Sequence, residues 1–157
     1  MTDAPADGFE LTVRREIAAS AEDLFDAWLD AESMSAWMKP TDIRETHAEN
    51  DPREGGSFRI RMVRNDSESV LHTGMYRVID RPRRLVFTWS SPHTDFRDSI
   101  VTVTFEALAS STVVQIHHVG LPSADEQAGH VDGWTSALAV LDRVMQPNDT
   151  RDRSNER

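Results

Sequence analysis

The chain changes its hydrophobic period once, and that change most limits the folds it can adopt. Through most of residues 9–119 apolar and polar residues alternate, as they do in strands with one buried face. After residue 123 apolar residues recur every three or four positions, as on one side of a helix: Val131, Trp134, Leu138, Leu141 and Met145. A single long helix must bury this stripe, and only a sheet offers enough apolar surface. The pattern therefore predicts a curved sheet packed around a C-terminal helix.

Turn residues divide the first part of the chain into strands and two short helices. The first strand is predicted at 9–17, followed by a helix capped by Ser20 and a second helix at 31–38 that stops at Pro40. Six further strands are predicted at 43–49, 57–63, 69–79, 84–90, 99–105 and 112–119. Short connections favour antiparallel neighbours, so the predicted class is α+β, with a curved antiparallel sheet of six or seven strands.

Length and composition indicate one domain. The 157 residues can bury a core without disulfides, and the absence of Cys excludes thiol catalysis and cysteine-ligated zinc. We expect a flexible N-terminus at 1–8, a single domain at 9–147 and a disordered charged tail at 148–157. No signal sequence or apolar run of membrane-spanning length is recognisable, so a cytoplasmic location is expected.

The net charge and the absence of several motifs limit which partners, cofactors and metals are expected. The net charge of −10 opposes nucleic acids and anionic membranes, so neither is expected as a partner. No phosphate-binding loop, nucleophile elbow or His-Glu-x-x-His motif occurs, so no cofactor and no metal are predicted. Glu45, His47 and Glu49 share one strand face, but without a second ligand pair an exposed edge strand is the better interpretation.

Three polar side chains are predicted to point towards the helix. His118 is in register with the apolar residues of its strand, whereas His117 has the opposite parity and should face solvent. A histidine on an apolar face is more often a hydrogen-bonded core group than a catalyst, and it could also anchor a ligand hydroxyl or carbonyl. His72 and Tyr76 share a strand face and could join it.

The remaining candidates are large apolar side chains. Trp89 is expected mainly in the core, while Trp134 is equally expected in the core or on a cavity wall. Gly133 should let helix and sheet approach closely. Ser123 and Glu126 predict a capping box, with His130 nearby at the helix start. Three more ligand contacts are predicted: Phe87, Phe105 and Leu138.

Five short motifs follow one another along the chain: Gly55-Gly56-Ser57-Phe58, Gly74-Met75-Tyr76, residues 82–89, residues 118–122 and Gly133-Trp134. Together they resemble the SRPBCC superfamily, whose START and birch-pollen-allergen members share the helix-grip fold. More narrowly they resemble bacterial homologues of the activator of heat-shock protein 90 ATPase, C-terminal domain family. The resemblance covers about residues 9–145. It implies a deep cavity between the C-terminal helix and the sheet that often holds an apolar or amphipathic small molecule.

The preferred hypothesis is a binding protein, monomeric or homodimeric, that holds an apolar or amphipathic small molecule without catalysis. His118, Tyr76 and Trp134 are the residues most expected to touch that molecule. One alternative is a small-molecule cyclase or hydrolyase that uses His118 or His72 as acid or base. Another is an interaction protein with a chaperone as partner, as the family resemblance implies.

Overall fold

The computed structural model describes residues 8–146 of the chain. Apart from Gly8, the predicted flexible N-terminus at 1–8 lies outside these residues, as does the predicted disordered tail at 148–157. None of the helices within the described part is long and apolar enough to cross a membrane.

The elements follow the predicted order. They are β1 Phe9–Ile17, α1 Ala21–Ala27, α2 Ala31–Trp37, β2 Ile43–Asn50, β3 Ser57–Arg64, β4 Ser69–Asp80, β5 Arg84–Trp89, the 3-10 turn η2 Pro92–Thr94, β6 Ser99–Ala107, β7 Thr112–Leu121 and α3 Ala124–Met145. The predicted capping residues Ser20 and Ser123 accept backbone N–H groups from Asp23 and Glu126. The turn η2 was not predicted.

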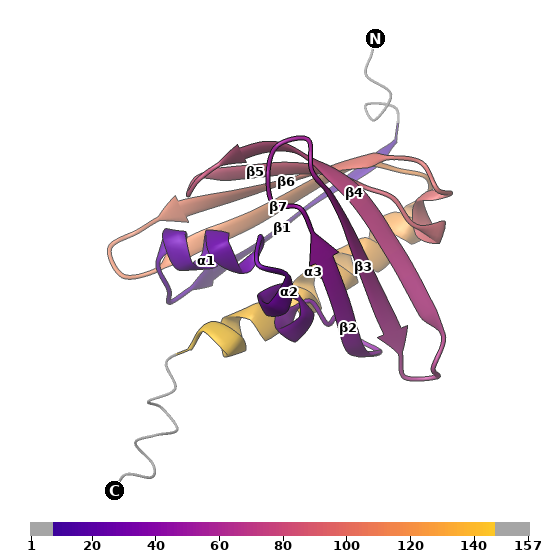
Figure 1. Cartoon of the computed structure of the whole chain (residues 1–157), viewed down its shortest axis with the longest axis horizontal. Helices are drawn as coiled ribbons and strands as arrows, with labels where there is room; N and C mark the ends of the chain where they lie inside the picture. Colours follow the sequence, from indigo (N-terminus) through magenta and orange to yellow (C-terminus); the bar gives the residue numbers. More distant parts are fainter. Residues whose placement is uncertain (1–7, 147–157) are drawn as a thin grey trace, which may run out of the picture.

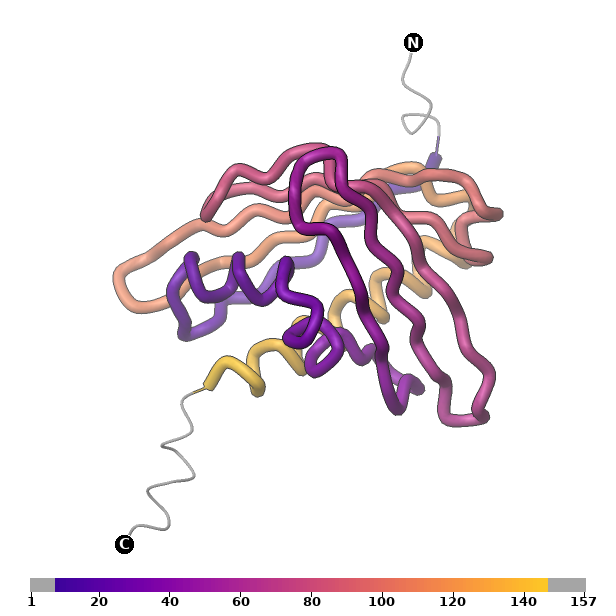
Figure 2. Tube along the Cα trace, viewed as in Figure 1, coloured from indigo at the N-terminus to yellow at the C-terminus, as the bar shows by residue number. Residues whose placement is uncertain are grey.

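The strands form one sheet in the order β1-β7-β6-β5-β4-β3-β2, with antiparallel neighbours throughout. Figure 1 shows this sheet curving over α3, with α1 and α2 beside the helix. The tube trace shows β3 and β4 descending steeply away from β5, β6 and β7, so that the sheet forms an arch (Figure 2). The predicted α+β helix-grip fold is therefore confirmed.

Helix α3 buries three residues of the predicted stripe, and a fourth, Met145, is partly buried. Trp134, Leu138 and Leu141 are buried against the sheet. Val131 was also predicted to belong to the buried stripe. That prediction is wrong, because 38% of the residue is exposed. At this turn His130 takes the more buried position, with only 12% of its side chain exposed.

Large side chains from α1, α2 and the sheet fill most of the space under the arch. Trp28 and Trp37 are almost fully buried and pack edge to face, with ring centroids 4.7 Å apart. The indole N–H of Trp37 donates to the carbonyl of Ala27 over 2.9 Å, which joins the two short helices. Trp28 also lies 6.0 Å from Trp134, between ring centroids. The two short helices thus supply a large part of the core.

Two glycines of the sequence motifs differ in how closely their surroundings pack against them. A Cβ on Gly74 would overlap the carbonyl oxygen of Thr88 and the ring of Phe58, so β4 needs glycine to pair closely with β5. A Cβ on Gly133 would meet only the Cβ of Pro40, at 3.8 Å, an ordinary contact. The expectation that Gly133 allows helix and sheet to approach closely is therefore wrong.

Alanine substitutions at these two glycines should have opposite effects on stability. Gly74→Ala should lower the free energy of unfolding by about 3 kcal/mol, because the strand backbone cannot move aside. Gly133→Ala should raise it by roughly 0.5–1 kcal/mol, because alanine favours the helix and has room. Urea denaturation followed by circular dichroism measures both. A tolerated Gly74→Ala would contradict the close packing at this position.

Candidate functional site

A pocket of about 220 Å³ lies between the first half of α3 and the ends of several strands. Its wall is mostly apolar and contains Trp89 from β5 and Trp134 from α3. Met38, just after α2, and Met62 of β3 add flexible thioether side chains. The pocket is half open, so a molecule could enter from solvent without the sheet separating from the helix.

A second space in the interior is much smaller. This void of about 10 Å³ is surrounded by side chains such as Trp28, Phe58 and Tyr76. A space of that size holds at most about one water molecule. Of these two spaces, the pocket beside the first half of α3 is the larger, and it lies between helix and sheet, where the family resemblance implies a deep cavity.

The eight predicted site residues fall into three groups. The pocket is lined by three of them: His72, Trp89 and Trp134. The small void is lined by Trp89 together with two others: Tyr76 and Phe87. Neither space is lined by the last three, all of them buried: His118, Phe105 and Leu138.

His118 is held by hydrogen bonds at both ring nitrogens. Its Nδ1 accepts the indole N–H of Trp134 over 3.1 Å, and its Nε2 lies 2.8 Å from the hydroxyl of Ser99. That hydroxyl donates to the carbonyl of Trp89 over 2.6 Å, so it must accept from His118. The ring is therefore the neutral tautomer with its proton on Nε2.

This chain of hydrogen bonds limits what His118 can do. Burial holds its pKa well below the ordinary value, aided by the nearby His130 and His117. A second proton on Nδ1 would face the N–H of Trp134, donor against donor. Because both nitrogens are engaged, His118 offers no free position for proton transfer to a bound molecule.

His72 lies in the pocket wall, and its surroundings differ from those of His118. Its ring stacks on Trp89 with centroids 4.7 Å apart and planes 22° apart. Only 7% of the residue is exposed, and its Nδ1 is buried without a hydrogen-bond partner. Burial, with help from His130 and His93, lowers the pKa of His72 to about 3. At neutral pH it is a neutral ring and a weak base.

Sequence reasoning missed two pocket histidines. His93 follows Pro92 in η2, and its Nδ1 lies 3.4 Å from a carboxylate oxygen of Glu126. His130 donates from Nδ1 to the backbone carbonyl of Glu126 over 2.7 Å.

The predicted capping box is only half present: Ser123 accepts the N–H of Glu126, but the Glu126 carboxylate lies beside these histidines. Burial lowers the pKa of His130, although its bond to Glu126 acts in the opposite direction. The four-residue spacing from Glu126 to His130 was the available signal.

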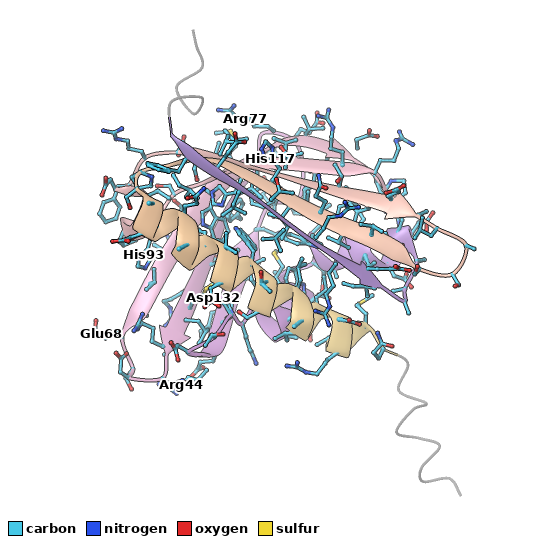
Figure 3. All side chains as sticks on the ribbon, turned by 180° about the vertical axis from the view of Figure 1, so that it is seen from behind. Arg44, Glu68, Arg77, His93, His117 and Asp132 are labelled. Atoms are coloured by element: carbon cyan, nitrogen blue, oxygen red, sulfur yellow. The ribbon has the colours of Figure 1, made fainter. Side chains whose placement is uncertain are left out.

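The outer face of the sheet carries the other histidines. His117, as predicted, is half exposed there and lies 2.6 Å from Glu10. Figure 3 shows His117 and Arg77 on the sheet side away from α3, while His93 and Asp132 lie along the helix. His47 pairs with Glu45 on the exposed edge strand β2. Among residues 8–146 no three metal-ligating side chains are arranged to hold an ion.

Trp134→Phe tests the hydrogen bond to His118. The variant leaves the buried Nδ1 of His118 without a donor, which should cost about 1–3 kcal/mol beyond the lost ring volume. Trp28→Phe is the matched control, since the Nε1 of Trp28 is buried without a partner. Urea unfolding should show a larger loss for Trp134→Phe. Equal losses would mean that the bond contributes nothing.

Buried neutral histidines predict a pH-dependent stability. The pKa values of His72, His118 and His130 are lowered from the ordinary 6.5, so only the unfolded chain takes up protons just below that pH. The free energy of unfolding should be level above about pH 7.5 and fall below 6.5, by up to about 1.4 kcal/mol per pH unit for each histidine.

Urea titrations at several pH values between 7.5 and 5.5 measure this slope. His72→Phe should reduce it by about one proton's contribution. A flat stability profile in the unmodified protein would show that these histidines protonate in the folded state.

Comparisons with known proteins support the fold. A protein from Chromobacterium violaceum has 21% sequence identity and a TM-score of 0.78, with 88% of this chain and 97% of that one covered. An HSP90 activator from Plasmodium falciparum has 22% identity and a TM-score of 0.71, covering 87% of this chain and 96% of that one. The AHSA1 protein from Silicibacter pomeroyi has 26% identity and a TM-score of 0.71, covering 86% and 96%.

The comparison with family models identifies a family as well as a fold. No curated protein matches the sequence. Residues 18–146 match the model of the family described as Activator of Hsp90 ATPase homolog 1-like protein. That match spans most of the chain and all of the pocket-lining residues. The chain therefore belongs to the Activator of Hsp90 ATPase homolog 1-like family.

Proposed function

We propose that this protein binds a small apolar or amphipathic molecule in the pocket between α3 and the sheet. The observation that supports this most is the position of the pocket: it opens where the aromatic filling from α1 and α2 ends. Its walls combine Trp89 and Trp134 with Met38 and Met62. Apolar concave surface of this kind with a few polar groups is typical of small-molecule sites.

The size of the pocket limits the molecule. A dry protein cavity of about 150 Å³ holds benzene, whereas sites for drug-sized ligands start at roughly 300 Å³. A volume of about 220 Å³ lies between the two. One or two fused rings fit this space, and a long-chain lipid does not unless the surrounding side chains move.

The histidines favour binding over catalysis. His118 has both ring nitrogens in hydrogen bonds, and the low pKa of His72 makes it a poor base at neutral pH. A catalyst needs a positioned group whose pKa lies near the working pH. For the cyclase or hydrolyase alternative, which named His118 or His72 as acid or base, His72 would have to take that role.

Chaperone activation is the second candidate, and family membership favours it. A structural neighbour from Plasmodium falciparum is an HSP90 activator. The net charge of −10 would attract a basic surface on a partner. If this role is correct, adding the purified protein to a chaperone of that class should raise its ATPase rate, in a salt-sensitive manner. An unchanged rate at low salt would contradict it.

A variant that blocks the pocket tests the binding proposal. Gly133→Leu places a side chain near Pro40, another wall residue, so it should stand across the pocket. Its matched control is Val131→Leu, two residues earlier on α3 and exposed. Titration of the isotope-labelled protein with naphthalene, followed by NMR, should show pocket resonances that shift in the unmodified protein and in the control.

In Gly133→Leu the affinity for naphthalene should fall at least about tenfold. Equal affinity in all three proteins, or shifts confined to another surface, would show that the pocket is not the binding site. Circular dichroism confirms that each variant is folded.

A further inference from the structure

Two residues of the pocket wall each carry a buried ring nitrogen without a hydrogen-bond partner. These nitrogens are Nδ1 of His72 and Nε1 of Trp89, in two residues that are 7% and 3% exposed. The two rings stack on each other, so both unpaired nitrogens belong to the same stretch of the pocket wall. Buried polar atoms in proteins are almost always paired, and an unpaired group on a pocket wall calls for an explanation. A ligand that reaches these atoms supplies one.

The charges around the pocket argue against an anionic ligand. Two carboxylates of α3, Glu126 and Asp132, lie on the lining. Arg64 is the one arginine or lysine of the described lining, and its side chain is 44% exposed with Nε 3.6 Å from Asp66. His72 is neutral, because burial lowers its pKa to about 3. A carboxylate or phosphate bound beside His72 would therefore meet two carboxylates of the lining and no buried cation to pair with.

Resting on the proposed binding function, we infer that the ligand is a neutral aromatic molecule of one or two rings that carries a hydroxyl group, a compound of the phenol class. A hydroxyl donates one hydrogen bond and can accept two. It can accept from the indole N–H of Trp89 and pair with His72 in either tautomer. The aromatic part then lies against Trp134 and the two methionines, in a space of about 220 Å³.

Three probes of similar shape separate this inference from simple apolar binding. They are 2-naphthol, which carries the hydroxyl, 2-methylnaphthalene, in which a methyl group replaces it, and 2-naphthoate, which is an anion. Dissociation constants come from NMR titration at neutral pH. A purely apolar pocket should favour the methyl compound, because its hydroxyl counterpart loses hydration on burial. We expect 2-naphthol to bind at least about fivefold more tightly than 2-methylnaphthalene and at least about tenfold more tightly than 2-naphthoate.

His72→Phe keeps the ring that stacks on Trp89 and removes its nitrogens. In this variant the preference for 2-naphthol over 2-methylnaphthalene should disappear, while His47→Phe on the exposed edge strand should retain it. If 2-methylnaphthalene binds the unmodified protein as tightly as 2-naphthol, the inference is wrong and the binding function stands. Tighter binding of 2-naphthoate also overturns it. If none of the three probes binds, the proposed function and the inference both fail. The comparison in the unmodified protein decides the matter even if His72→Phe does not fold.

Discussion

One directed chain of hydrogen bonds ties α3 to the sheet, and the site depends on it. The indole N–H of Trp134 donates to His118, His118 donates to Ser99, and Ser99 donates to the backbone carbonyl of Trp89. Each buried donor has one acceptor, so the imidazole tautomer is fixed by its surroundings. The bond holds the Trp134 ring as a pocket wall, 5.1 Å from Trp89 between centroids. The histidine that sequence favours as a ligand contact thus acts on the pocket through Trp134.

The second constraint is the competition for space under the arch. A curved seven-stranded sheet and one helix would enclose a large cavity, as the family resemblance implies. Here Trp28 and Trp37 lie in that space, where they pack on each other and Trp28 lies against Phe87 of the sheet. Burying such large rings stabilises the fold substantially. The larger of the two spaces described lies at the end near His72 and His130, and the ligand proposed for it is correspondingly small.

Much of the fold could be predicted because its signals are local. Strand parity alone placed His118, His72 and Tyr76 inside, and Ser123 marked the start of α3. The site was less predictable because it depends on contacts between distant segments. The partner of His118, Ser99, lies on the neighbouring strand β6, and the pocket boundary depends on how residues of α1 and α2 pack. At Gly133, for example, the position of the residue in the sequence does not show how close the nearest side chain outside the helix lies.

The most direct test of this account is the state of the His118 ring in solution. Long-range nitrogen–proton correlation NMR on the labelled protein distinguishes the two tautomers and the charged ring of each histidine. The account predicts that His118 remains neutral, with its proton on Nε2, as the pH falls from 7.5 to 5, because burial lowers its pKa and Trp134 occupies Nδ1. A His118 that titrates near its ordinary value of 6.5, or that exchanges between tautomers, would show that the hydrogen-bond chain does not hold the helix to the sheet.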